Sequence, residues 1–200
     1  MEILWHGNTC FSFKDKKATI VVNPDKEAGE LKADAVLSGL GKDTAPVQDA
    51  YKVFDWPGEY EIKGIPIVGL QVWTKSKSKE DEEGVKGSET LAFYFEMNGV
   101  KICHLGTIGH VLTSEALKTI GDVDILLIDG TKEGNLGSNK ATEILENIDP
   151  KAVVFMGKGD QKDFMKELGA EGVQEQETYE IDSLSQLPPD KRVYILLKKS

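Results

Sequence analysis

The stretch Ala33–Val47, ADAVLSGLGKDTAPV, begins as a strand that is apolar enough to be covered on both faces and continues into a glycine-rich loop. The loop is open to three interpretations: a phosphate cradle, a plain turn, or a ligand loop that has lost its ligands. A P-loop requires a second glycine followed by lysine and then by serine or threonine. Here Gly41-Lys42 is followed by Asp43, and Val36 stands where the first glycine is required. The phosphate interpretation is therefore excluded.

Strands and turns alternate around this loop over the first hundred residues. Runs such as EILWHG, ATIVVNP and YKVFDW are rich in β-branched and aromatic residues, and glycine, asparagine and proline interrupt them. The clearest local signal is Asn98-Gly99 between two apolar runs, because this pair favours a two-residue hairpin turn. The first half of the chain therefore predicts short strands with a hairpin at residues 98–99.

The second half changes to strand and helix in alternation. One helix is predicted over Ser114–Ile120, with Thr113 as its cap. A second helix begins with Ser138 or Asn139 as its cap, and a third falls within residues 160–169. A strand-rich half followed by strand–helix alternation is typical of stacked sheets flanked by helices, which is an α/β architecture.

The composition is that of one globular domain with an acidic surface. Because no composition break divides the 200 residues, a single domain over residues 1–200 is predicted. Lys and Arg number 24 against 34 Asp and Glu, and the net charge of -10 argues against nucleic-acid binding. No segment resembles a signal peptide or a membrane span. Cys10 and Cys103 lie in strand-like apolar runs, which favours buried free thiols and predicts a cytoplasmic protein.

Several phrases spread over nearly the whole chain carry a family resemblance. They are GNTCF at Gly7–Phe11, PGEYEIKGI at Pro57–Ile65, ICHLGTIGH at Ile102–His110, GDVDILLI at Gly121–Ile128 and VFMG at Val154–Gly157. Together they resemble the metallo-β-lactamase superfamily, most closely its ascorbate-6-phosphate lactonase-like branch. The resemblance implies a four-layer αββα sandwich. It also implies a family site with one or two metal ions, which activate a water for hydrolysis.

Of the positions that the resemblance assigns to metal ligands, only Asp43 keeps the family's residue, and the others carry different residues in this chain. The family's His-x-His-x-Asp-His loop falls on the stretch after the Ala33 strand, its bridging aspartate on HLGT, and its last histidine on VFMG. Glycine offers no side chain, and a threonine hydroxyl is a poor zinc ligand at neutral pH. We therefore expect neither a zinc or manganese cofactor nor catalysis of the family kind. The vestigial positions are Gly39, Gly41, Asp43, Thr44, Thr107 and Gly157.

Two functions from different classes remain open. The first is a non-catalytic scaffold that binds a protein or small molecule, either in the vacated cleft or through the charged segment Thr74–Glu89, whose other interpretation is a solvated loop. The second is a hydrolase of a phosphorylated, lactone or nucleotide substrate that uses a rearranged site. The candidate cleft residues are Asp43, His104, Thr107 and Lys158, and a rearranged metal site would combine His104 and His110 with Asp43 or Cys103.

Two further features have both a structural and a functional interpretation. Met156–Phe164, MGKGDQKDF, is compatible with an anion site at a helix N-terminus, but an ordinary strand-to-helix connection is favoured. Trp5, Trp56 and Trp73 are expected in the core, with self-association into a homo-oligomer as the alternative.

Overall fold

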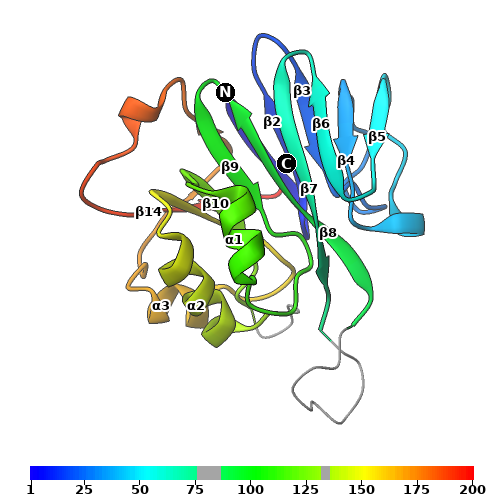
Figure 1. Ribbon diagram of the computed structural model, residues 1–200. Coiled ribbons are helices and arrows are strands. Elements are labelled where there is room, and N and C mark those ends of the chain that lie inside the picture. The colour runs from blue at the N-terminus through cyan, green and yellow to red at the C-terminus, as the bar shows by residue number, and fades with distance from the viewer. Residues whose placement is uncertain (76–86, 132–135) are drawn as a thin grey trace.

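Two β-sheets packed face to face form the centre of the molecule, and helices lie to one side of them (Figure 1). The computed structural model describes residues 1–75, 87–131 and 136–200. The centre of the charged segment Thr74–Glu89, residues 76–86, lies outside the described residues, as do residues 132–135. The arrangement confirms the predicted α/β class, with a strand-rich first half and strand–helix alternation in the second.

The smaller sheet has six strands in the order β13-β1-β2-β3-β4-β5. Strands β1 to β3 are antiparallel, and β4 and β5 add to β3 in parallel. At the other edge β1 pairs with β13, and a bridge joins Trp5 to Lys199, so segments from both ends of the chain meet here. The strands are β1 (Glu2–Gly7), β2 (Cys10–Lys14), β3 (Thr19–Val22), β4 (Ala35–Leu37), β5 (Lys52–Phe54) and β13 (Tyr179–Glu180).

The larger sheet has eight strands in the order β12-β14-β11-β10-β9-β8-β7-β6. Strands β6 to β9 form an antiparallel meander, and the remaining strands are parallel. The predicted hairpin is confirmed between β8 and β9, where Asn98 and Gly99 have φ of 53° and 72°, the left-handed values this turn needs. The strands are β6 (Gly58–Ile62), β7 (Ile65–Trp73), β8 (Glu89–Met97), β9 (Val100–His104), β10 (Ile125–Ile128), β11 (Ala152–Phe155), β12 (Glu175–Gln176) and β14 (Val193–Leu197).

The helices α1 (Ser114–Ile120), α2 (Ser138–Ile148) and α3 (Lys162–Glu167) lie together beside the larger sheet (Figure 1). Thr113 caps α1 as predicted, since its hydroxyl accepts a hydrogen bond from the Ala116 N–H at 3.2 Å. The predicted side-chain cap of α2 is wrong: Gly137 occupies the cap position, and the Ser138 hydroxyl donates to Glu167 of α3. Among the described residues, none of the helices has the length and apolar character that crossing a membrane requires.

Loop segments cover the outer face of the smaller sheet. Cys10 and Val21 point to that face and form a second apolar cluster with Ala28 and Ala33, against which Leu31 and Val47 pack. The residues between β3 and β5 therefore provide the outer layer on this side, together with the 3₁₀ turn η1 (Gly41–Asp43). Both cysteines are buried free thiols, as expected.

The interior between the sheets is built from aromatic and aliphatic side chains of both. Phe13 of β2 and Phe95 of β8 are fully buried, and their rings meet edge to face with centroids 5.0 Å apart. Such pairs contribute beyond the area they bury, because the ring edge and ring face carry opposite partial charge. The contact joins the two sheets directly.

Replacing Phe95 with alanine is expected to lower the free energy of unfolding by about 3–5 kcal/mol, because it removes a buried ring and leaves a cavity between the sheets. Urea denaturation followed by circular dichroism measures the change. Tyr51→Ala is the matched control, since that aromatic side chain is 86% exposed, and it is expected to change stability by less than about 0.5 kcal/mol. Equal losses in the two variants would contradict this account of the core.

Candidate functional site

The loop after β4 closes on itself through side-chain hydroxyl groups. The Thr44 hydroxyl donates to the Gly41 carbonyl at 2.7 Å, and the Ser38 hydroxyl bonds to the Thr44 hydroxyl at the same distance. The Ser38 oxygen in turn accepts the Leu40 N–H at 3.2 Å. Thr44 is therefore engaged within the loop, whereas Asp43 stands exposed on the η1 turn.

Gly39 lies against the larger sheet, with both of its backbone polar groups bonded. Its N–H donates to the Asn23 side-chain oxygen at 2.9 Å, and its carbonyl accepts the Thr90 hydroxyl at 3.0 Å. The Thr90 oxygen lies 3.1 Å from the Thr107 hydroxyl, which donates to it because the Thr90 proton is directed to Gly39. A Cβ atom at Gly39 would lie 2.6 Å from the Leu91 nitrogen and from the Thr90 hydroxyl. Two vestigial positions, Gly39 and Thr107, are thus brought together through Thr90.

Gly157 follows β11 at the third vestigial segment. Its N–H donates to the Asn8 carbonyl at 2.9 Å, and its φ of 107° favours glycine. A Cβ atom here would lie 2.3 Å from the Asp129 carboxyl group. The carboxylate accepts the backbone N–H of Thr131 at 3.0 Å and the Thr131 hydroxyl at 2.6 Å. Sequence analysis missed Asp129, although a single aspartate directly after the apolar strand β10 was the available signal.

The residues present do not fit the metal site that the fold family implies. The six vestigial positions supply three glycines, two threonine hydroxyls that are already bonded within the protein, and one exposed carboxylate. Within residues 1–75, 87–131 and 136–200, no group of three or more His, Cys, Asp or Glu side chains has a metal-binding arrangement. A divalent transition ion needs three or four nitrogen, sulfur or carboxylate ligands.

His104 is fully buried, and both of its ring nitrogens are bonded. Nε2 lies 3.0 Å from the Thr9 carbonyl and donates to it, and Nδ1 accepts the Gly106 N–H at 3.1 Å. This pairing fixes one neutral tautomer. Burial lowers the pKa of His104 to about 4, although the bond to Thr9 acts in the opposite direction. The ring packs edge-on against Phe11 in the core.

Two further residues of the rearranged site, His110 and Cys103, are also engaged or buried. His110 accepts the Trp73 N–H through Nε2 at 3.1 Å and donates from Nδ1 to the Val111 carbonyl at 2.8 Å. The Cys103 thiol is fully buried, and burial raises its pKa to about 12.

Lys158, the basic residue of the connection after β11, is paired. Its ammonium group lies 2.5 Å from the Glu27 carboxylate.

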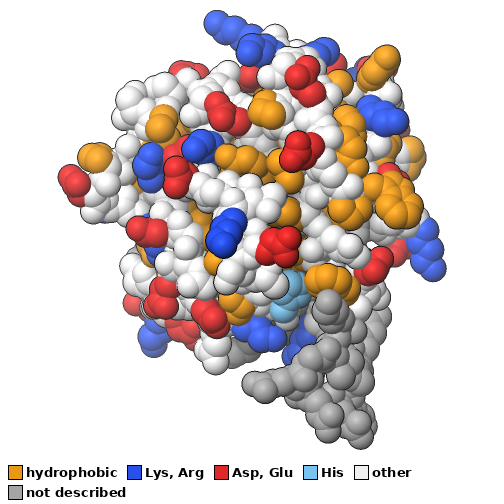
Figure 2. All heavy atoms as spheres, in the orientation of Figure 1, with side chains coloured by type: hydrophobic (Ala, Val, Ile, Leu, Met, Phe, Trp, Pro, Cys, Tyr) orange, Lys and Arg blue, Asp and Glu red, His pale blue; other side chains and the backbone are white. Residues whose placement is uncertain are grey.

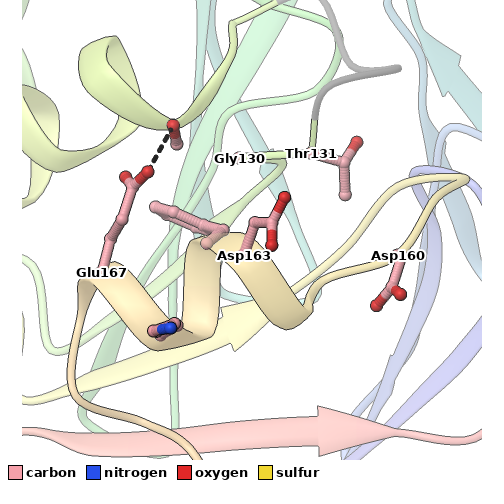
Figure 3. Close-up of a pocket in the computed structure, with 8 residues that line it drawn as sticks. Gly130, Thr131, Asp160, Asp163 and Glu167 are labelled. Atoms are coloured by element: carbon pink, nitrogen blue, oxygen red, sulfur yellow. Dashed lines mark hydrogen bonds between the residues drawn. The ribbon is translucent and has the colours of Figure 1, made fainter.

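A pocket of about 250 Å³ lies between α3 and the segment after β10, and Figure 3 shows Asp160, Asp163 and Glu167 around it. The carboxylates make this pocket unsuited to an anion.

A cleft of about 300 Å³ lies over the Ser38–Gly41 loop. We call it the Trp56 cleft, because Trp56, in the connection from β5 to β6, forms one of its walls and is 73% exposed. The expectation of a core position is wrong for this tryptophan, since it follows an edge strand. Figure 2 shows hydrophobic side chains on the side of the molecule where β5 and β6 lie. The remaining lining residues are Asp55, Pro57, Gln71, Glu89, Thr90 and Leu91.

Comparison with protein families identifies the class of protein. A family model described as a beta-lactamase superfamily domain matches residues 2–157, and the chain therefore belongs to that family. A comparison with curated protein sequences found no match.

Solved structures share the fold over almost the whole chain. A proposed zinc-dependent hydrolase of the metallo-β-lactamase superfamily from Thermotoga maritima is 25% identical, with a TM-score of 0.78 over 99% of this chain and 100% of that chain. A proposed metal-dependent hydrolase from Parabacteroides distasonis is 12% identical, with a TM-score of 0.68 over 98% and 92% of the two chains. An isothiocyanate hydrolase from Delia radicum gut bacteria is 13% identical, with a TM-score of 0.64 over 90% and 99%. The resemblance and the sandwich fold predicted from the sequence are confirmed.

Gly39→Ala is expected to lower the free energy of unfolding by about 1–3 kcal/mol, because the added methyl group meets a backbone nitrogen that cannot yield without moving β8. Thermal and urea unfolding measure the loss. Lys42→Ala, an exposed change in the same loop, serves as the control and is expected to stay within about 0.5 kcal/mol of the parent. An unchanged Gly39→Ala variant would show that the loop has room for a side chain.

Lowering the pH from 7 to 4 is expected to destabilise the protein progressively. The unfolded chain protonates His104 near its ordinary pKa of 6.5, whereas the folded state resists protonation until pH is about 4. As pH falls through this window the unfolded state binds more protons, and stability falls by on the order of 3 kcal/mol. Burial also lowers the pKa of His6, which acts in the same direction.

Urea midpoints measured at intervals across this pH range test the effect. In His104→Gln the decline is expected to be shallower, because that side chain does not titrate. A parent protein whose stability is flat between pH 6.5 and 4 would contradict the neutral, buried state of His104.

Proposed function

We propose that this chain is a non-catalytic member of the family that binds a protein or small-molecule ligand in the Trp56 cleft. The proposal rests on two features at Gly39: the crowding of its loop and the cleft above that loop. The loop that would hold metal ligands is bonded to both sheets, and at Gly39 it has no room for a side chain. Yet a cleft of about 300 Å³ remains directly over the same loop. Small-molecule sites have this volume and this mixture of apolar wall and few polar groups.

The alternative is hydrolysis through a rearranged site. It is favoured by the full-length similarity to the Thermotoga maritima structure, a proposed zinc-dependent hydrolase. Against it stand the engagements of its candidate residues: both nitrogens of His104 are bonded, the Thr107 hydroxyl is directed to Thr90, and Lys158 is paired with Glu27. An activated nucleophile or general base needs a free position that faces substrate.

A cytoplasmic location and a homo-oligomeric state complete the proposal. The buried free thiols Cys10 and Cys103 suit a reducing compartment. The exposed indole of Trp56, at one edge of the sandwich, suits contact with a partner.

The proposal is tested by screening a chemically diverse small-molecule library against the ¹⁵N-labelled protein. The expected result is a ligand that shifts the amide signals of Gly39 and Gly41 and the indole N–H of Trp56. Trp56→Ala should weaken that ligand about tenfold, since it removes a cleft wall, whereas Tyr51→Ala, which does not line the cleft, should leave affinity unchanged.

The same protein is assayed with lactone, phosphomonoester and nucleotide substrates in the presence of added zinc or manganese. No turnover is expected. Turnover that is lost in Asp43→Asn or Thr107→Ala would overturn the non-catalytic assignment. A library in which no compound shifts the cleft signals would overturn the binding assignment.

A further inference from the structure

The Trp56 cleft carries negative charge that no side chain of its described lining balances. Asp55, in the connection after β5, and Glu89, the first residue of β8, both line it. Neither carboxylate forms an ion pair or hydrogen bond with another residue in the described part of the chain. The described lining also contains no lysine, arginine or histidine, and Lys42 of the adjoining loop does not contribute to it.

The hydroxyl groups of the cleft are directed away from a ligand. The Ser38 hydroxyl bonds to Thr44, and the Thr90 hydroxyl donates to the Gly39 carbonyl. An anionic ligand would therefore meet two carboxylates, with neither hydroxyl proton available to it. A charged group entering this cleft is stabilised only if it is positive.

Trp56 is held in place by its backbone while its indole is exposed. The Tyr60 hydroxyl donates to the Trp56 carbonyl at 2.8 Å, and the Tyr60 ring packs on the buried Phe54 with centroids 4.6 Å apart. The backbone of this connection is thus ordered before any ligand binds, which reduces the entropy lost on binding. An indole face attracts cations through its quadrupole, more strongly than any other side-chain ring.

We propose that the ligand of the Trp56 cleft is an organic cation, with an ammonium or guanidinium group that contacts the Trp56 indole and is balanced by Asp55 and Glu89. This inference rests on the proposed binding function and specifies its ligand class. The cation is carried either by a small metabolite or by a lysine or arginine side chain of a partner protein, since both present the same group. Leu40, Pro57 and Leu91 provide apolar surface for the stem of either.

Choline and its uncharged carbon analogue, in which carbon replaces the quaternary nitrogen, test the inference by titration of the labelled protein. Choline is expected to shift the Trp56 indole signal and to bind at least about tenfold more tightly than the analogue, which has the same shape without the charge. The affinity for choline should fall as salt is added, since the carboxylates are exposed and screened.

A short capped peptide with one central arginine, titrated in parallel, distinguishes the two sources of the cation. Tighter binding of the peptide indicates a protein partner, and tighter binding of choline indicates a metabolite.

Charge-removing variants provide the matched comparison. Asp55→Asn combined with Glu89→Gln should weaken the cation by about tenfold. Glu59→Gln combined with Glu61→Gln removes the same charge from exposed positions of the neighbouring strand β6 that do not line the cleft, and should change affinity by less than about twofold.

Equal binding of choline and its analogue, or an unchanged affinity in the Asp55/Glu89 variant, would overturn the cation assignment. So would an anion that binds the cleft more tightly than choline. In each of these cases a ligand still occupies the cleft, so the proposed function would survive. The absence of any shift at Trp56 with choline, the analogue, the peptide and the whole library would overturn both.

Discussion

The hydroxyl group of Thr90 joins the two sheets between Gly39 and Thr107. Thr90 belongs to β8 of the larger sheet, and it donates to the carbonyl of Gly39, which follows β4 of the smaller sheet. It accepts from Thr107, which follows β9. The loops after β4 and β9 are thus connected through β8 by neutral hydrogen bonds. Each bond contributes on the order of 1 kcal/mol, and none buries a charge that needs compensation.

A second set of contacts ties the remaining loops to the same region. Asn23 adopts a left-handed backbone conformation, accepts the Gly39 N–H, and donates its amide to the Thr9 hydroxyl at 3.3 Å. Gly157 bonds to Asn8 and leaves the space beside it to the Asp129 carboxylate. Glycine at positions 39 and 157 therefore lets the backbone approach neighbours that a side chain would displace.

Local chemistry made some elements predictable from the sequence. The Asn98-Gly99 turn and the Thr113 cap were predictable because each depends on residues adjacent in the chain. The cap of α2 was not, because the Ser138 hydroxyl is drawn to Glu167 of α3, a tertiary partner that no local pattern reveals. Trp56 was expected in the core on hydrophobicity alone, whereas its exposure follows from the position of β5 at a sheet edge.

In the candidate site, too, the contacts between residues distant in the chain could not be predicted from the sequence. The family phrases predict which positions are vestigial, but they do not reveal the neighbours Thr90, Asn23 and Asp129 that surround Gly39 and Gly157. Each of these contacts joins residues distant in the chain. The Trp56 cleft likewise depends on three separate segments meeting over one loop.

The pairing of β1 with β13 has a consequence for how the chain reaches its native state. Glu2 and Ile3 find their partners at Glu180 and Tyr179, and Trp5 is bridged to Lys199, so the smaller sheet contains contacts of very large sequence separation. Contacts of this kind slow folding, because the entropy of closing a long loop is lost before the contact forms. During synthesis β1 emerges long before β13, so its outer edge stays unpaired until β13 has been synthesised. Such an edge is open to pairing with other chains, which makes the nascent protein a candidate client for chaperones.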